Sequence, residues 1–235
     1  TAIRTSMLRR ANLSRYQVLI LPVGRGSAYK SALGEEGVAR LRDWVEAGGV
    51  LISLGSATQL LADPDVDLLA IRREEAVVEV EIEVEGNDGA TVAGSYITSD
   101  SEYRDAIVSV TGAPDSVAGV LVRAEADQEH WLTAGIAPEL HVLARGSDIY
   151  TPIRFDNGSN VVRFKGPDEL VASGYLWEEN KRQLAYKPAV VSQAVGTGQV
   201  IGFTQDPTVR AYLDGLNVLL MNAIFRGAAH ARPVR

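Results

Sequence analysis

The stretch GGVLISLGSATQLLAD, residues 48–63, decides the fold expected of this chain. An apolar run over 50–54 stops at Gly55 and is followed by a helical pattern over 57–62. A buried strand, a sharp turn and a helix in direct succession are the arrangement in which many α/β enzymes present a nucleophile. The first question is therefore what chemistry is available at this turn, where the sequence has Gly55 and Ser56.

The segments before this turn complete a strand–helix–strand unit. Residues 18–21 form a buried apolar strand that is followed by a turn with Gly24 and Gly26. Residues 35–47 carry apolar side chains at helical spacing and are followed by a glycine pair, which is typical of a helix end. Two apolar strands joined by a helix favour parallel pairing. We therefore expect an α/β fold with a flavodoxin-like, doubly wound, mainly parallel sheet.

The pattern changes after residue 73. Residues 78–85 alternate apolar side chains with glutamates, which is typical of a strand with one face in solvent. Calcium binding is one explanation for the acidic run, but carboxylates that alternate along a strand diverge from a tight loop cage, so a solvated sheet face is favoured. Three further strands are expected, at 118–126, 139–146 and 159–166. The predicted organisation is an α/β domain formed by 1–73 and 169–235, with a β-rich insertion or subdomain at 74–168.

The C-terminal part returns to α/β patterns. The glycine-rich residues 196–198 join two apolar runs and predict a hairpin. A final helix is predicted from Asp206, a good N-cap that precedes Pro207, to Gly227 as its C-terminal stop. The expected apolar stripe of this helix consists of Tyr212, Leu216, Leu219, Leu220 and Ala223.

Composition limits the classes of function. The chain has 235 residues, 46% of them hydrophobic, which is enough to form the core of one large domain or two small ones. The net charge of −7 and the lack of a Lys/Arg cluster argue against nucleic acid as a partner. No apolar run approaches the roughly 20 residues that span a bilayer, so no membrane partner is expected. The absence of cysteine excludes disulfides, thiolate metal sites and a cysteine nucleophile.

The sequence around the turn resembles the nucleophile elbow of class I glutamine amidotransferases. In SLGSATQLLA, residues 53–62, Gly55 takes the place of the nucleophilic cysteine and residues 59–61 match the Q-L-L of the family. The glycine turn at Gly24 and Gly26 corresponds to the oxyanion-hole loop. Near the C-terminus, GFTQDP at 202–207 resembles the strand end that carries the catalytic base.

The resemblance does not extend to the catalytic triad. Asp206 follows Gln205 at the position of the family's histidine, and Thr208 takes the place of its glutamate. Glycine at position 55 offers no attacking atom. Ser56 has the only hydroxyl group left at the turn, but no histidine is positioned by a motif to couple it to Asp206. Capping roles are favoured for both, Ser56 for the short helix after the turn and Asp206 for the last helix.

A second resemblance covers most of residues 12–227 and is weakest over 74–115. The segments LSRYQVLILPVG (13–24) and LRDWVEAGGVLISLG (41–55) are similar to the domain that follows the catalytic domain in bacterial zinc carboxypeptidases of the carboxypeptidase A type. The resemblance implies an upstream peptidase domain of the same polypeptide as partner, zinc bound only in that domain, and export from the cytoplasm. The start at Thr1, without an initiator methionine, fits a domain of a longer polypeptide.

Zinc ligands and other binding motifs are not evident in this chain. His130, His141 and His230 have no Glu or His at an H-x-x-E, H-x-x-H or H-E-x-x-H spacing, so no metal is expected here. The stretch GRGSAYKS, 24–31, lacks the spacing of a phosphate-binding loop. The aromatic side chains of GYLWEENKRQL, 174–184, are available for stacking on a ligand or a partner, although packing in the core or between domains is favoured.

The sequence therefore predicts a non-catalytic accessory domain, structural or for recognition, of a zinc carboxypeptidase-like protein. One alternative is a hydrolase that uses Ser56. Another is a small-ligand-binding module with a vestigial pocket lined by Gly24, Gly26, Gly55, Ser56, Gln205 and Asp206. Because few residues precede the strand at 18–21, we expect one strand of the family's sheet to be missing and a homo-oligomer contact at the edge that is left exposed.

Overall fold

The computed structural model describes residues 1–77, 98–99 and 114–231. In this part of the chain the strands are joined in one sheet with the order β1-β2-β8-β7-β5-β3-β4, and β6 pairs with β3. The strands are β1 (Val18–Leu21), β2 (Val50–Leu54), β3 (Val117–Ala126), β4 (Glu139–Gly146), β5 (Ser159–Phe164), β6 (Val171–Ser173), β7 (Pro188–Val195) and β8 (Gly198–Phe203). The α-helices are α1 (Gly26–Glu46), α2 (Thr58–Leu61), α4 (Glu178–Leu184) and α5 (Asp214–His230).

The sheet is mixed, and the expectation of a mainly parallel sheet is wrong. Only β1, β2 and β8 run parallel, with Val18 opposite Val50 and Val50 opposite Gln199. The remaining pairs are antiparallel, beginning with the hairpin of β7 and β8 that residues 196–198 predict. A tight hairpin reverses the chain direction, so β7 lies antiparallel to β8 and ends the parallel part of the sheet. The strands expected at 118–126, 139–146 and 159–166 are present and extend this same sheet through the pairing of β5 with β7.

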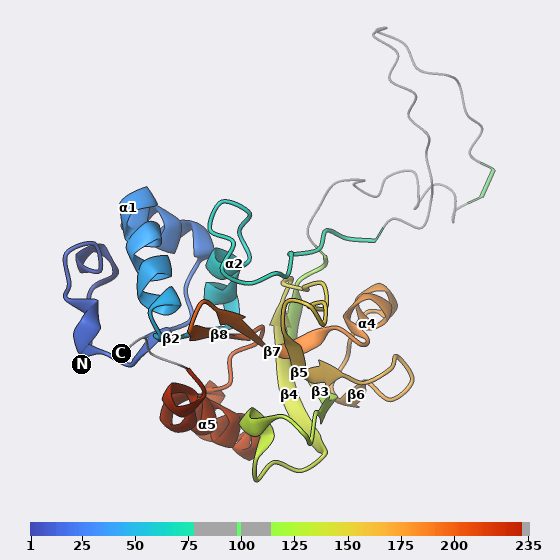
Figure 1. Cartoon of the computed structure of the whole chain (residues 1–235). Helices are drawn as coiled ribbons and strands as arrows, with labels where there is room; N and C mark the ends of the chain where they lie inside the picture. The colour runs from blue at the N-terminus through green and yellow to red at the C-terminus, as the bar shows by residue number, and fades with distance from the viewer. Residues whose placement is uncertain (78–97, 100–113, 232–235) are drawn as a thin grey trace, which may run out of the picture.

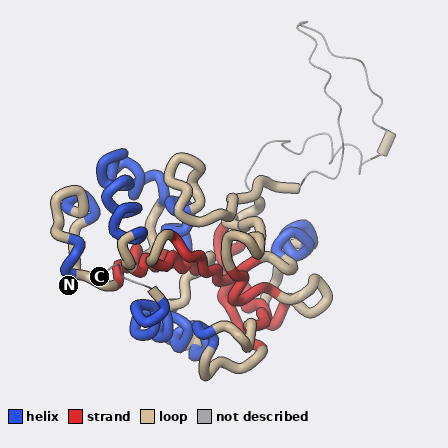
Figure 2. Tube along the Cα trace, viewed as in Figure 1, coloured by secondary structure: helices blue, strands red, loops and turns tan. Residues whose placement is uncertain are grey.

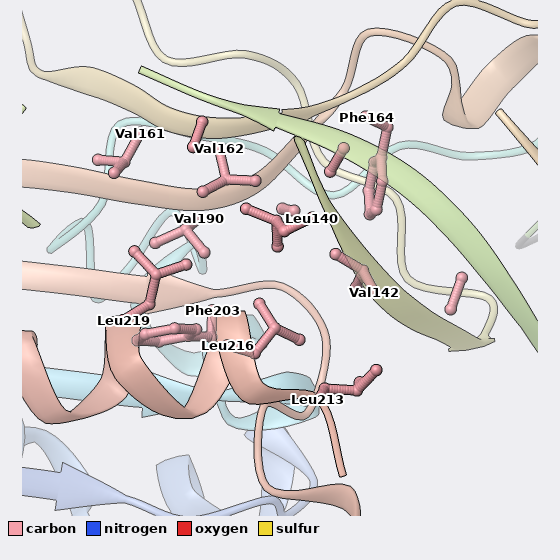
Figure 3. Packing of buried hydrophobic residues seen from close by; sticks show 14 of the residues in the cluster. Leu140, Val142, Val161, Val162, Phe164, Val190, Phe203, Leu213, Leu216 and Leu219 are labelled. Atoms are coloured by element: carbon pink, nitrogen blue, oxygen red, sulfur yellow. The ribbon is translucent and has the colours of Figure 1, made fainter. Parts of the chain in front are cut away.

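Helices cover the two faces of the parallel part of the sheet (Figures 1 and 2). α1 and α2 lie on one face, where Leu41, Val45 and Leu61 belong to one buried apolar cluster. α5 lies on the other face, where Leu216 and Leu219 pack with Phe203 in a second cluster (Figure 3). Because helices cover both of its faces, β2 is buried at every residue, which explains why its sequence is a continuous apolar run.

Two helix boundaries differ from expectation. α1 begins at Gly26, and Gly34, with φ 60°, interrupts it before the segment predicted at 35–47. The last helix begins at Asp214, because Arg210 and Ala211 adopt left-handed φ values of 50° and 52° that interrupt a helix after Asp206. Helix α5 then runs past the predicted stop at Gly227 to His230.

Gly227 has a packing role instead of a terminating one. It is buried inside α5, and a Cβ atom at this position would lie 3.0 Å from Val50 Cγ1 of β2. The glycine therefore allows close contact between helix and sheet.

Three expectations concern edges and surfaces. β1 pairs with β2 alone among the described strands, which leaves its other edge without a strand in this part of the chain. The alternating acidic segment at 78–85 lies outside the described residues. Tyr175 and Trp177 contact each other in a T-shaped arrangement at 5.2 Å between ring centroids, but both are exposed. Packing in the core is therefore wrong, and packing between domains stays a prediction. None of the helices in the described ranges is both long and apolar enough to cross a bilayer.

Candidate functional site

The sharp turn after β2 has the geometry of a nucleophile elbow. Gly55 follows the last residue of the strand directly and starts a short 3₁₀ turn, Gly55–Ala57, that leads into α2. Its φ of 54° is in the left-handed region that only glycine adopts without strain. The elbow therefore keeps its backbone shape at the position where the resembling family has a reactive side chain.

Buried hydroxyl groups hold the elbow in place. The hydroxyl group of Thr58 donates a hydrogen bond of 2.9 Å to the carbonyl oxygen of Phe203 at the end of β8. Ser53 Oγ lies 2.9 Å from Thr58 Oγ1 and acts as the donor of this pair, since the proton of Thr58 is already used. Both side chains are fully buried, so these bonds link the end of β2, the start of α2 and the end of β8 in a dry environment.

Three segments meet around Gly55. A Cβ atom on Gly55 would lie 3.4 Å from the backbone nitrogen of Asp206 and 3.4 Å from Val23 Cγ2. The end of β2 thus lies beside the loop that follows β8 and the loop that follows β1. This is the arrangement expected where neighbouring parallel strands end at one edge of a sheet.

A pocket of about 330 Å³ opens at this junction. Gly55, Ser56, Gln205 and Asp206 line it, together with residues from the end of β4 and the loop after it. Arg145 of β4 and Asp148 of the loop after β4 line the same pocket. Of the six positions predicted from the sequence, the structure brings together Gly55, Ser56, Gln205 and Asp206. Arg145 and Asp148 were not predicted from the sequence.

The curl of the sheet explains how β4 reaches this pocket. β4 is several strands away from β8 in the sheet order, yet the backbone N–H of Arg145 donates a 2.9 Å hydrogen bond to Gln205 Oε1. Gln205 is buried and fixes the end of β8 against the end of β4. Nothing in the local sequence of β4 indicates this contact, because strand periodicity shows which face is buried but not where a curled sheet closes.

Gly24 and Gly26 are not part of the pocket lining. A Cβ atom at Gly24 would lie 2.9 Å from the ring of Tyr29, and one at Gly26 would lie 2.6 Å from Gln59 Cβ. The N–H group of Gly26 donates to Gln59 Oε1 at 3.2 Å. Both glycines therefore permit close packing at the start of α1.

The matched Gln59 has a structural role next to the pocket. Its Nε2 donates to Asp148 Oδ2 at 2.7 Å, and the other carboxylate oxygen of Asp148 pairs with Arg73 Nε at 2.8 Å. Asp148 is thus neutralised by Arg73. In contrast, the guanidinium group of Arg145 is exposed and has no ion pair among the residues that the structure describes.

No hydrogen bond joins Ser56 to Asp206 in the described part of the chain, and both capping expectations are wrong. Ser56 lies inside the 3₁₀ turn and makes no cap hydrogen bond for α2, and within the described residues its hydroxyl group has no hydrogen-bond partner. Asp206 accepts hydrogen bonds from the backbone N–H and the hydroxyl group of Thr208, at 2.8 and 2.6 Å, in a local turn eight residues before α5. The carboxylate is therefore engaged in loop structure.

No histidine is among the residues that line this pocket in the described part of the chain. His230 stacks on Trp131 with 4.1 Å between ring centroids, and the ring of the preceding His130 lies 5.5 Å from Trp131 in a tilted arrangement. Burial lowers the pKa of His130, and the nearby Asp127 opposes this effect. Across residues 1–77, 98–99 and 114–231, no three His, Asp or Glu side chains gather as metal ligands.

Comparison with known sequences gives no assignment: no protein-family model and no curated protein matches the chain. Solved structures do match. A ThuA-like protein from Parabacteroides merdae ATCC 43184 superposes with a TM-score of 0.55 at 14% identity, covering 96% of this chain and 75% of that protein. A ThuA-like protein from Bacteroides uniformis ATCC 8492 gives 0.52 at 14% identity, covering 97% and 75%.

A β-galactosidase from Bacillus circulans sp. alkalophilus matches with a TM-score of 0.48 at 12% identity. The match covers 96% of this chain, which spans only 24% of the length of that enzyme. The likeness to the ThuA-like proteins shows the fold: an α/β domain with a mixed, partly parallel, curled sheet that resembles the class I glutamine amidotransferase-like fold. Neither of the two ThuA-like proteins is described as a zinc carboxypeptidase, so attachment to a peptidase rests on the resemblance in sequence alone.

Proposed function

We propose that this chain is a non-catalytic recognition domain that binds a small ligand with an anionic group in the pocket beside Gly55. The observation that carries the proposal is the backbone of the elbow, which keeps the left-handed turn and an open pocket of about 330 Å³ although position 55 has no side chain to react. A site that holds this geometry without a nucleophile is suited to binding and unsuited to acyl transfer.

The charges around the pocket support an anionic ligand. Asp148 is paired with Arg73, and Asp206 accepts two hydrogen bonds from Thr208. Arg145 is the cationic residue of the lining, and its guanidinium group has no ion pair within the described residues. A guanidinium group binds carboxylate or phosphate oxygens through two parallel hydrogen bonds, which favours ligands of this type.

Membership of a zinc carboxypeptidase-like protein and export remain predictions from the sequence resemblance. In that setting the recognition domain would hold a group of the peptide or cell-wall substrate for the upstream peptidase domain. The proposal for the pocket does not depend on this setting, because it rests on residues of this chain alone.

Binding is tested by nuclear magnetic resonance on the full chain, titrated separately with acetate, inorganic phosphate and L-glutamine. We expect shifts of the Gly55, Ser56 and Arg145 amide signals, and about tenfold weaker binding in Arg145→Gln, since a hydrogen bond to a charged group contributes about 1.5–3 kcal/mol. Arg154→Gln is the matched control, because Arg154 is exposed and lies outside the pocket. If no probe moves the pocket signals, or if both variants bind equally, the proposed site is wrong.

Catalysis is tested on the same preparation with glutaminase, esterase and carboxypeptidase substrates, with and without zinc. We expect no turnover. Hydrolysis that disappears in Ser56→Ala would show that the serine hydrolase is the correct function.

A further inference from the structure

Helix α5 has an exposed apolar surface on the side that faces away from the sheet. Val218, Met221 and Phe225 are 39%, 51% and 72% exposed. Their spacing of three and four residues places them on one side of the helix. We call these three residues the α5 ridge.

The other side of α5 is already occupied by the core. Leu216, Leu219, Ala223 and Gly227 are buried against the sheet, as Figure 3 shows for the two leucines. α5 is therefore apolar on two opposite sides.

The outward face of α1 is different. It carries the exposed charges of Glu35, Glu36, Asp43 and Glu46. This polar outward face is the usual composition of a helix that covers a sheet in water. A single exposed apolar side chain requires no explanation, but a row of them on one helix face marks an interaction surface.

We propose that the α5 ridge is a self-association surface, which packs antiparallel against the α5 ridge of a second copy of this chain around a two-fold axis. The charges at the two ends of α5 indicate that the partner is a second copy of this helix. Asp214 lies in the first turn, and Arg226 lies near the C-terminal end. In an antiparallel pair each Asp214 approaches the basic end of the other helix, and the helix dipoles are opposed.

A parallel pair would place the two Asp214 carboxylates together and the two Arg226 guanidinium groups together, which is unfavourable. In the antiparallel pair the acidic end of each α5 lies beside the basic end of the other, so the charges of these residues are complementary without a second kind of protein. Two-fold contacts of one patch with itself are the commonest interfaces in homo-oligomers.

The spacing within the ridge also suits an antiparallel pair. With the two-fold axis close to Met221, the bulky Phe225 of one copy faces the smaller Val218 of the other, and the two Met221 side chains meet at the centre. Large side chains opposite small ones interdigitate well.

The area of the α5 ridge limits the affinity of the dimer. A helix of 17 residues is about 25 Å long, so its outward side covers roughly a few hundred Å² per copy. Stable interfaces bury roughly 800 Å² per partner. We therefore expect a reversible dimer with a dissociation constant on the order of 100 µM.

The arrangement is tested by cysteine cross-linking, for which the chain is suited because it contains no cysteine. Met221→Cys is expected to form a disulfide-linked dimer on mild oxidation. Val218→Cys alone is expected not to, because the two copies of position 218 lie about 10 Å apart along the pair, beyond the roughly 7 Å limit for a disulfide. An equimolar mixture of Val218→Cys and Phe225→Cys should give the mixed dimer.

The control for random collision is Ala39→Cys, an exposed position on the outward face of α1. Cross-linking of Val218→Cys with itself as efficiently as in the mixture would overturn the antiparallel arrangement. Equal cross-linking of Met221→Cys and Ala39→Cys would overturn the interface.

The association itself is measured by sedimentation equilibrium of the full chain over a concentration series. Phe225→Glu is expected to weaken the dimer at least about tenfold, a loss of roughly 1.4 kcal/mol, whereas Ala39→Glu leaves it unchanged. Circular dichroism of both variants verifies that they are folded. A wild-type chain that stays monomeric at millimolar concentration would refute the proposal, and so would a dimer that is insensitive to Phe225→Glu.

Discussion

The two faces of the parallel sheet are packed in different ways. On the α1 side, backbone meets backbone: a Cβ atom at Gly198 of β8 would lie 1.9 Å from the carbonyl oxygen of Val45, and Thr197 N–H donates to Glu46 O at 2.9 Å. On the α5 side the neighbour is a side chain: a Cβ atom at Gly227 would lie 3.0 Å from Val50 Cγ1. A backbone atom in such a contact cannot move without shifting the whole strand or helix, whereas a side chain can change its rotamer. A larger residue in place of glycine should therefore destabilise the protein more on the α1 side than on the α5 side.

The largest effect is expected for Gly198→Ala. The new methyl group would overlap a backbone oxygen, so the end of α1 and the hairpin must move apart, and we expect a loss of about 3 kcal/mol or more in the free energy of unfolding. Urea denaturation measures this loss. Gly135→Ala is the control: its φ is 82° but its Cβ meets nothing within 4 Å, so it should lose only about 1–2 kcal/mol. Equal losses in both variants would contradict the backbone packing described for the α1 side.

A smaller loss is expected for Thr58→Val, which tests the hydroxyl pair at the elbow. Valine fills the same space but removes a hydrogen bond to the carbonyl of Phe203 and leaves the hydroxyl of Ser53 without its acceptor in a dry site, so stability should fall by about 2 kcal/mol. Thr58→Ser keeps the hydroxyl group and loses one methyl group, about 0.8 kcal/mol. If the serine variant is the less stable of the two, methyl packing rather than hydrogen bonding holds the elbow.

On the α5 side, Gly227→Ala should change the free energy of unfolding by less than about 1 kcal/mol. Alanine favours the helix by about 1 kcal/mol over glycine, and this gain offsets part of the strain against Val50, whose side chain can shift. The same denaturation experiment gives the value. A loss as large as that of Gly198→Ala would mean that the two faces are equally rigid.

The smallest effect concerns pH at the contact between α5 and the turn at Trp131–Thr133. His130 Nδ1 accepts the N–H of Leu132 at 3.2 Å, and burial lowers the pKa of His130 in the folded protein. Since the unfolded chain binds the proton more readily, stability is complete above the ordinary histidine pKa of about 6.5 and falls as the pH drops through it. The groups that face His130 are Asp127, which opposes the shift, and His230, which adds to it.

The matched variant is His130→Asn, because asparagine can accept the same hydrogen bond without titrating. Urea denaturation at pH 7.5 and 5.5 should show a greater loss in the wild type than in the variant. Equal losses would assign the pH dependence to other groups, including His230, whose pKa is also lowered by burial.

Local elements were predictable from sequence where a few neighbouring residues decide them. The strands at 18–21 and 50–54, the turn at Gly55 and the hairpin at 196–198 agree with the structure. The start of the last helix did not agree, because Asp206 and Pro207 form a good N-cap pattern, whereas the chain turns at Arg210 and Ala211 to bring α5 onto the sheet. Capping preferences contribute about 1 kcal/mol, which packing of a helix on a core readily exceeds.

The sequence by itself determined the elbow, the βαβ unit and the absence of a nucleophilic side chain at position 55, since each depends on residues that are close together in the chain. The tertiary structure decided the mixed sheet, the position of Arg145 and Asp148 beside Gly55, and the apolar outward side of α5. These features depend on how a curled sheet closes and which helix side it buries, and this is set by contacts between residues far apart in sequence, such as Arg145 with Gln205. Periodicity indicates that a residue is apolar or polar, but only packing determines which apolar residues remain at the surface.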